Sequence, residues 1–380
     1  MTPERIRVLL DRAVRLASRG HGGAEPNPMV GCVITAADGE IIADGYHRRW
    51  GEAHAEVAAL AAAGGRARGG TAIVTLEPCA HRGRTGPCCD ALVAAGIAEV
   101  VFAVADPNPL AVGGAAKLAA AGVRVQRFEH AGSNELTLPF LKRISSGLPW
   151  ISAKWAQSID GAVALANGDS QWLSCSRSRR MVHRERGRVD AILTGIGTVL
   201  EDDPRLTARD GRSTRPQRRV VFDPDARTPL DSKVVDGTLP TTILVRADAE
   251  APVVARRRRL AEAGVTVIEL GVGDSIEPAL RILATEGVST VLVESGGGLV
   301  GRLIRERLLD EAWIFVAPIL VADDVARRCA RGLMPEVLAA IPRGRLLSVR
   351  RRGSDALLHY RWTMATPAAT TLESTHMIKT

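Results

Sequence analysis

Residues 77–89, "EPCAHRGRTGPCC", bring three cysteines and a histidine together among Pro, Gly and Arg, and the tripeptide "HAE" upstream supplies His54 and Glu56. One His and two Cys would leave the fourth position of a tetrahedral zinc ion open. That arrangement is typical of catalytic zinc sites, whereas structural sites are usually closed by four protein ligands. The residue types therefore predict a zinc-dependent hydrolytic centre.

The spacing of these residues suggests a role for each. Two positions apart on a helix, His54 and Glu56 point in different directions, so they would rarely bind one ion together. His54 can be a ligand while Glu56 reaches the zinc-activated water, takes up its proton and returns it to a leaving amine. Cys79 follows a predicted strand, and Cys88 or Cys89 opens the next helix, whose N-terminus favours a thiolate. The pattern His-x-Glu followed by Pro-Cys-x-x-Cys is the signature of zinc nucleobase deaminases. Here the loop between the cysteines is longer, with eight residues between Cys79 and Cys88.

Other interpretations of the cluster stay open at this point. A structural zinc could use three Cys together with His54 or His81, although such a site would not need the Glu. Neighbouring residues on a helix face about 100° apart, so either Cys88 or Cys89 could be the ligand and the other a packing residue. Cys32 lies in the apolar segment "VGCVI" and is predicted to be a core residue.

Length and composition indicate a globular protein of two domains. The chain has 380 residues, of which 46% are hydrophobic and 24% charged. No apolar run reaches the 18 residues of a membrane span, and residues 4–18 predict an amphipathic helix, not a signal peptide. By default we expect a cytoplasmic protein. Six cysteines are too few for a disulfide scaffold.

The net charge of +8 raises the question of nucleic-acid binding. Aromatic residues make up only 3%, so side chains that could stack on bases are scarce. Arg is scattered apart from the run at residues 256–259, which is predicted to be a solvated helix face. Small anionic substrates such as phosphates suit Arg equally well.

Alternating helices and strands are predicted along both halves. In the first 145 residues we expect helices near residues 4–18 and 54–65, two strands within 29–47 joined at Asp38-Gly39, a strand at 70–79, and helix–strand pairs within 88–109 and 115–128. The polar stretch 142–150 is the predicted boundary. A strand at 150–164 follows, then α/β alternation through residues 190–204, 218–224, 241–248, 265–270, 288–298 and 313–320. The predicted domains are 1–146 and 147–365, with a disordered tail at 366–380.

Two glycine-containing segments could bind phosphate. Gly195, Gly197 and Thr198 follow an apolar strand and could expose backbone amides to an anion. Gly296, Gly298 and Gly301 form a literal G-x-G-x-x-G between a predicted strand and helix. A Rossmann fold also needs an acidic residue after the next strand and further repeats, and neither is evident. The glycines could instead serve only a tight turn.

The sequence resembles a known family in both halves. The segments "EPNPMVGCV", "HAE", "TLEPCAHRGRTGPCCDAL" and "DPNP" resemble the deaminase half of the bifunctional riboflavin-biosynthesis deaminase/reductases. The patterns "K.A.S.DG.A", "G.SQW", "DAI..G..TV..DDP.LT.R" and "VE.G..L" resemble the reductase half. The resemblance covers about residues 4–360. It implies a three-layer α/β/α domain of the cytidine-deaminase type followed by a dihydrofolate-reductase-like α/β domain.

The resemblance also implies roles for individual residues. In the first half, His54, Cys79 and Cys88 would bind zinc and Glu56 would shuttle the proton, with substrate contacts from Asn27, His47, His81, Arg84 and Thr85. In the second half, the implied NADPH contacts are Ala156, Trp172, Thr198, Asp202, Gly296, Gly297, Gly298, Leu299, Val300, Gly301 and Arg302. The implied substrate contacts are Ser170, Arg186, Leu206, Arg209 and Glu294, with Lys154 and Asp160 in assisting positions. The chain departs from the family pattern around Gly113, Pro224, Ser295 and Val321.

The implied activity is zinc-dependent hydrolytic deamination of 2,5-diamino-6-(5-phosphoribosylamino)pyrimidin-4(3H)-one, followed by NADPH-dependent reduction of the ribosyl group of 5-amino-6-(5-phosphoribosylamino)uracil to ribityl. The expected partners are these small molecules and further copies of the chain, with neither nucleic acid nor membrane. One alternative is a nucleic-acid base deaminase with a basic binding module. A second is a zinc-stabilised interaction protein without activity.

Overall fold

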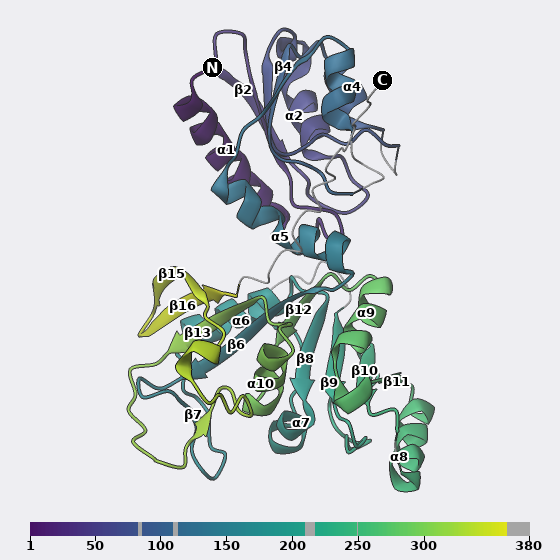
Figure 1. Ribbon diagram of the computed structural model, residues 1–380, viewed down its shortest axis with the longest axis vertical. Coiled ribbons are helices and arrows are strands. Elements are labelled where there is room, and N and C mark those ends of the chain that lie inside the picture. The colour runs from purple at the N-terminus through teal and green to yellow at the C-terminus, as the bar shows by residue number, and fades with distance from the viewer. Residues whose placement is uncertain (83–85, 109–112, 210–216, 249, 363–380) are drawn as a thin grey trace, which may run out of the picture. The chain divides into compact units, whose positions relative to one another are not determined.

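The computed structural model describes residues 1–82, 86–108, 113–209, 217–248 and 250–362, and Figure 1 shows its elements. Arg84, Thr85 and the predicted tail at 366–380 lie outside the described residues. Two compact units make up the chain. The first consists of Met1–Trp150, Val182–Ile192 and Pro204–Val291, and the second of Ile151–Met181, Leu193–Asp203 and the residues from Leu292 onward. Of the helices in the described part of the chain, none is long and apolar enough to cross a membrane.

A five-stranded mixed sheet forms the centre of the first 150 residues. Its strand order is β2 (Ile41–Tyr46), β1 (Gly31–Thr35), β3 (Thr71–Leu76), β4 (Glu99–Val104) and β5 (Arg124–Arg127). Strand β1 runs antiparallel to β2 and β3, whereas β3, β4 and β5 are parallel. Every residue of β1 and β3 is buried, as expected for strands covered on both faces.

Helices cover both faces of this sheet. Helix α1 (Pro3–Ala17) packs against β1 and β3 and against α5 (Ala131–Ser146), which also contacts β4 (Figure 1). On the other side, α2 (Ala55–Ala63) packs against β1, β2 and α3 (Cys88–Ala94), and α3 contacts α4 (Gly114–Ala120). The three-layer α/β/α architecture is therefore confirmed, as are the predicted helices and strands up to residue 128.

Helix α5 was not predicted from the sequence. Its hydrophobic periodicity is weak and Pro139 lies inside it, where proline removes a backbone donor. The polar residues assigned to a boundary, from Lys142 onward, are its last turn, and the helix ends at Gly147 in a left-handed conformation (φ 68°). Strand β6 then begins at Trp150, the residue at which the first strand of the second half was predicted to begin.

The second half is also built of strands and helices in alternation. In the first unit, β10 (Thr241–Val245) pairs in parallel with both β9 (Arg218–Phe222) and β11 (Thr266–Glu269). Helix α8 (Ala251–Glu262) connects β10 to β11, and helix α9 (Glu277–Thr285) follows β11. In the second unit, β6 (Trp150–Gln157) runs parallel to β13 (Glu311–Val316), which pairs antiparallel with β16 (Asp355–Arg361), and β16 pairs with β15 (Arg345–Arg352). Strand β7 (Ala162–Ala164) pairs with β14 (Arg327–Arg328).

Strands β8 (Ala191–Gly195) and β12 (Thr290–Val293) lie next to each other. The backbone N–H of Asp190 donates to Thr290 O at 3.1 Å, and that of Glu294 donates to Leu193 O at 3.0 Å. Helix α6 (Ser176–Arg186) precedes β8, α7 (Ile196–Asp202) follows it, and α10 (Gly297–Arg305) follows β12. Strands and helices therefore alternate along residues 190–204 and 288–305, as the α/β alternation predicted.

The arginine run at residues 256–259 lies on α8. Arg256 donates to the Asp225 carbonyl, and Arg257 and Arg258 form ion pairs with Glu269 and Glu262. Arg256 and Arg257 are half-buried and Arg258 and Arg259 are exposed, so the predicted solvated face holds for Arg258 and Arg259.

Glycine at position 45 lets α2 approach the sheet closely. A Cβ atom on Gly45 would lie 2.5 Å from Ala59 N and 2.7 Å from Ala55 O, both in the backbone of α2. Because α2 begins directly after His54, this contact sets where the start of the helix lies relative to the sheet.

Replacing Gly45 should therefore destabilise the fold. We expect Gly45→Ala to lower the free energy of unfolding by about 1–3 kcal/mol, the usual cost of overpacking, measured by urea denaturation. Gly65→Ala is the matched control, because a Cβ there meets no described atom within 4 Å, and it should change stability by no more than about 0.5 kcal/mol. Equal stabilities for the two variants would contradict the tight contact between α2 and β2.

Candidate functional sites

Three side chains from separate segments converge next to the five-stranded sheet. His54 is the N-cap of α2, Cys79 lies just beyond β3, and Cys88 is the first residue of α3. The His54 Nδ1 atom is 3.2 Å from Cys88 Sγ and 3.6 Å from Cys79 Sγ. Ligand atoms around a tetrahedral zinc with normal bond lengths lie about 3.3–3.8 Å apart. The 3.6 Å distance lies in this range and the 3.2 Å distance lies just below it, and the donor set suits this metal.

Cys89 points away from this cluster. In the described part of the chain, the group of side chains able to hold a metal ion consists of His54, Cys79 and Cys88, with all ligand atoms within 4.8 Å of one another. The Cys89 thiol instead donates to the Pro78 and Gly114 carbonyls at 3.3 and 3.5 Å and packs in the apolar core. Residue type and spacing left Cys88 and Cys89 open, and the geometry favours Cys88, the cysteine that the family resemblance implied.

Hydrogen bonds already favour a thiolate in this cluster. A hydrogen bond from the Cys88 thiol, together with the Cys88 backbone N–H at 3.4 Å, lowers the pKa of Cys79 well below its usual range. The hydrogen bond to Cys79 in turn raises the pKa of His54. Because a thiolate, not a thiol, is the metal ligand, this environment prepares Cys79 to bind a cation.

Glu56 lies in the first turn of α2 and is only 3% exposed. Burial raises its pKa to about 7. A carboxyl group that titrates near neutral pH can both accept and return a proton. The position of Glu56 beside the cluster therefore suits a proton shuttle.

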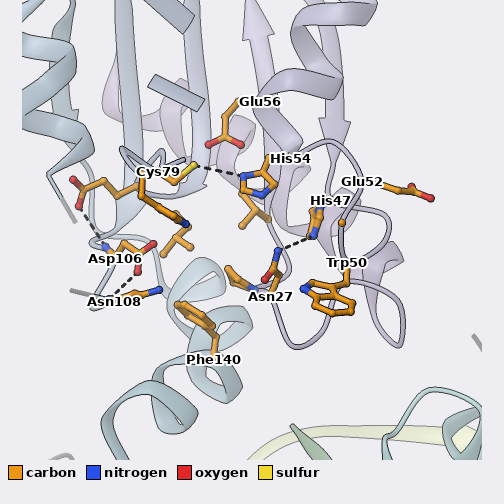
Figure 2. A pocket seen from close by; sticks show the side chains of 16 residues that line it. Asn27, His47, Trp50, Glu52, His54, Glu56, Cys79, Asp106, Asn108 and Phe140 are labelled. Atoms are coloured by element: carbon orange, nitrogen blue, oxygen red, sulfur yellow. Dashed lines mark hydrogen bonds between the residues drawn. The ribbon is translucent and has the colours of Figure 1, made fainter. Parts of the chain in front are cut away.

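A cavity of about 200 Å³ opens in front of these residues (Figure 2). Its walls are formed by Asn27, Pro28, Val30, His47, Trp50, Gly51, Glu52, His54, Glu56, Leu76, Glu77, Cys79, His81, Asp106, Asn108 and Phe140. Figure 2 shows His54, Glu56 and Cys79 along one side and Asn27, Trp50 and Phe140 along the other. The cluster and the apolar rings thus face the same space.

Asn27 and His47 form a hydrogen-bonded pair on the cavity wall. His47 Nδ1 is 3.1 Å from the Ala53 carbonyl, so this nitrogen carries the proton. Burial lowers the pKa of His47, which favours the neutral ring, and its Nε2 then accepts from the Asn27 amide at 3.4 Å. The amide is therefore oriented with its nitrogen towards His47.

The cavity contains residues that sequence reasoning missed as well as ones it predicted. His81 lines the wall, and its Nδ1 is buried with no hydrogen-bond partner among the described residues. Sequence reasoning did not single out Trp50, Glu77, Asp106, Asn108 and Phe140. The "DPNP" segment was a signal for Asp106 and Asn108, but Phe140 lies on the unpredicted helix α5.

In the second unit, polar groups gather near the ends of strands β8 and β12. Lys154 Nζ on β6 lies 3.6 Å from the Glu294 carboxylate beyond β12. The Thr194 hydroxyl donates to the Glu294 carbonyl at 2.7 Å, and Gly195 N donates to Ser295 Oγ at 3.0 Å. The carboxyl ends of parallel strands are the usual ligand-binding edge of α/β sheets. The Gly195 amide is engaged by Ser295, however, so the predicted exposure of this amide to an anion is wrong.

All residues predicted to contact the cofactor belong to the second unit. Ala156 lies on β6, Thr198 and Asp202 on α7, and Gly296–Arg302 at the start of α10, with Gly296 as its N-cap. Trp172 is 67% exposed, with the Arg179 guanidinium 4.7 Å from its ring centre.

The glycines before and within α10 fall into two kinds. A Cβ on Gly297 or Gly301 would lie 2.4 or 1.9 Å from the carbonyls of Arg328 and Arg331, so these two positions require glycine for packing. A Cβ on Gly296 or Gly298 would meet no described atom within 4 Å. Only Gly296 and Gly298 therefore leave open space beside the backbone. The three glycines of the literal G-x-G-x-x-G match thus differ in role, because Gly301 is required for packing.

The residues predicted to bind the second substrate are divided between the units. Ser170 and Glu294 belong to the second unit, and Arg186, Leu206 and Arg209 to the first. Within the first unit, the Arg186 guanidinium donates to Thr207 O at 3.1 Å, next to the buried Leu206. Val321 is one of the positions at which the chain departs from the family pattern. Its backbone N–H donates to the Asp160 carboxylate at 3.2 Å, so this position has a hydrogen-bond partner.

Two family descriptions match the chain. Residues 149–358 match the RibD C-terminal domain, and residues 3–104 match the cytidine and deoxycytidylate deaminase zinc-binding region. The riboflavin biosynthesis protein RibD of Escherichia coli is 39% identical over 359 residues, covering 92% of this chain and 97% of that protein. The RibD protein of Aquifex aeolicus is 37% identical over 317 residues, covering 83% and 87%.

Solved structures agree with these matches over the full fold. Acinetobacter baumannii RibD superimposes with a TM-score of 0.82 at 35% identity, covering 96% of this chain and 100% of that one. A diaminohydroxyphosphoribosylaminopyrimidine deaminase/5-amino-6-(5-phosphoribosylamino)uracil reductase of Thermotoga maritima has a TM-score of 0.79 at 30% identity, covering 95% and 99%.

Proposed function

The chain belongs to the RibD family of bifunctional riboflavin-biosynthesis enzymes, and from this premise we propose how its residues divide the two reactions. It is a zinc-dependent deaminase and an NADPH-dependent reductase. We assign deamination to residues 1–146 and reduction to residues 147–365. We further propose a cytoplasmic, homo-oligomeric enzyme.

The proposed substrates follow the activities named for the Thermotoga maritima relative. The first domain deaminates the diaminopyrimidine phosphoribosyl compound, and the second reduces the ribosyl group of the aminouracil product. One observation carries the deaminase assignment: His54, Cys79 and Cys88 meet within 4.8 Å beside the buried Glu56, at the wall of a cavity with room for a small ring.

In the deaminase site, each residue has a distinct task. His54, Cys79 and Cys88 hold zinc, which supplies Lewis acidity to a water molecule when it is bound. Glu56 accepts a proton and returns it to the leaving amine. Asn27 and His47 orient the pyrimidine through their polar groups, and His81 offers its unpartnered Nδ1 to the substrate.

In the reductase site, the chain positions two reactants. NADPH supplies the hydride when it is bound. Gly296 and Gly298 leave space for the cofactor before and within α10. The other proposed cofactor contacts are Ala156, Trp172, Thr198, Asp202, Gly297, Leu299, Val300, Gly301 and Arg302.

The reductase substrate is bound by a second set of side chains. Ser170, Leu206 and Glu294 contact the sugar part of the substrate, and Arg186 and Arg209 bind its phosphate, because guanidinium groups match phosphate oxygens. Lys154, which pairs with Glu294, helps to hold that carboxylate in place.

A Glu56→Gln variant tests the deaminase assignment within the bifunctional enzyme. Wild-type enzyme given the diaminopyrimidine substrate should release ammonia without NADPH and oxidise NADPH only after deamination. Glu56→Gln should release ammonia about 10²–10⁴-fold more slowly, since it lacks the proton acceptor. It should keep its zinc and oxidise NADPH normally when the deaminated substrate is supplied.

Two results would count against this order of reactions. NADPH oxidation by wild-type enzyme without ammonia release would show that reduction precedes deamination. Full deaminase activity in Glu56→Gln would remove Glu56 from the chemistry. A zinc-stabilised protein without activity would release no ammonia in either form.

The choice between the adjacent cysteines is tested by zinc content. Cys88→Ser should lose most of its zinc in metal analysis after dialysis, because the hydroxyl is a much poorer ligand than a thiolate. Cys89→Ser should retain one zinc per chain, since its hydroxyl can still donate to Pro78 O. Loss of zinc from both variants would instead indicate four protein ligands and a structural site.

Trp50 is proposed as an aromatic wall against the pyrimidine. Stacking of a base on an aromatic ring contributes about 1–3 kcal/mol, so Trp50→Ala should raise the deaminase KM roughly tenfold or more in steady-state assays. Trp50→Phe keeps an aromatic face and should restore most of the affinity. A KM unchanged in Trp50→Ala would show that the indole does not touch the substrate.

A further inference from the structure

Glu77 is a buried carboxylate that the deaminase chemistry does not use. It lies one residue beyond β3, two residues before Cys79, and is 7% exposed. Its Oε1 accepts from Ala115 N at 2.9 Å, and its Oε2 accepts from Asp106 N at 3.3 Å. The side chain therefore ties the end of β3 both to the first turn of α4 and to the loop after β4.

A second set of contacts joins the same segments. The Cys89 thiol donates to the carbonyls of Pro78 and Gly114 at 3.3 and 3.5 Å. A Cβ on Gly114 would lie 1.8 Å from Pro78 O, so the start of α4 lies directly against the turn that carries Cys79. We call Glu77, Cys89 and Gly114 the α4 clamp.

The clamp acts on the turn that holds Cys79. From the α3 side, Cys88 N donates to Cys79 Sγ at 3.4 Å and Cys89 N donates to Cys79 O at 3.3 Å. From the α4 side, this turn is held only through the clamp among the described contacts. Without Glu77, the backbone N–H groups of Ala115 and Asp106 would lose their acceptor, and on the α4 side the turn would keep only the contacts of Cys89 and Gly114.

We propose that Glu77 is a positioning residue for the zinc site, acting through Cys79 and supported by Cys89. The proposal rests on the proposed function, in which Cys79 is a zinc ligand. Both carboxylate oxygens are used, so Gln, with one acceptor oxygen and an NH₂ group facing the second N–H, cannot replace it. Asp106, held by the same carboxylate, also lines the cavity, so the clamp shapes the substrate wall as well.

The test measures zinc affinity in the full-length chain by competition with a chelator. Removing groups that orient metal ligands typically weakens metal binding about 10–100-fold, and we expect Glu77→Gln to fall in this range. The visible spectrum of the Co²⁺-substituted protein should also change, because it reports the geometry of the thiolate ligands. Reductase turnover on the deaminated substrate should remain normal and serves as an internal control for folding.

Glu99→Gln is the matched control. Glu99 lies on β4 of the same sheet and accepts from the Thr71 hydroxyl at 3.3 Å, but it does not line the cavity. Its variant should bind zinc as the wild type does. Zinc affinity and a Co²⁺ spectrum in Glu77→Gln within twofold of wild type would overturn the proposal.

Two further variants separate the possible outcomes. If Glu77→Gln fails to fold, Cys89→Ala is compared with Cys89→Ser, which keeps a donor to Pro78 O. A loss of about two- to fivefold in zinc affinity only in Cys89→Ala supports the clamp, and equal affinities overturn it. His54→Ala tests the premise: if it binds zinc normally, the proposed ligand set is wrong. If His54→Ala loses zinc while Glu77→Gln does not, only the clamp is wrong.

Discussion

Two cysteine sulfurs and an imidazole nitrogen held within 4.8 Å of one another are the constraint on which the first half of this protein depends. Thiolates so close repel one another unless a cation and N–H donors compensate their charge. The structure supplies one such donor from the backbone of α3, the Cys88 N–H that donates to Cys79 Sγ. The sheet, α2 and α3 hold these groups in place, and the rest of the cavity is arranged around them.

In both halves, residues of the proposed sites lie at or just beyond the ends of strands. In the first, Cys79 and Asp106 follow the adjacent parallel strands β3 and β4. In the second, Gly195 ends β8 and Glu294 follows β12, and Lys154 reaches Glu294 from within β6. Side chains beyond the carboxyl ends of parallel strands meet at one edge of a sheet. Two unrelated chemistries can therefore be placed on one chain by varying loops after strands.

Much of the fold and of the zinc site could be predicted because their signals are local. Alternation of apolar segments with turns indicated strands β1 to β5 and their helices, and helix-terminal positions indicated His54 and Glu56. Helix α5 was missed because its apolar periodicity is weak and it contains Pro139. Phe140 was missed with it, and Trp50 was missed because an aromatic residue in a loop carries no periodic signal.

The sequence by itself determined the chemistry: which donor types are present, that one His and two Cys leave a coordination position open, and that an acid lies beside them. These follow from residue type and short spacing, which survive without knowledge of the fold. Residue type and spacing left Cys88 and Cys89 open and the family resemblance implied Cys88. The physical reason for favouring Cys88 came from the tertiary structure, because a rotation of about 100° per helical residue turns one sulfur to the cluster and the other to the core. The tertiary structure also decided the roles of Glu77 and Gly114, since contacts between segments distant in sequence leave no local pattern.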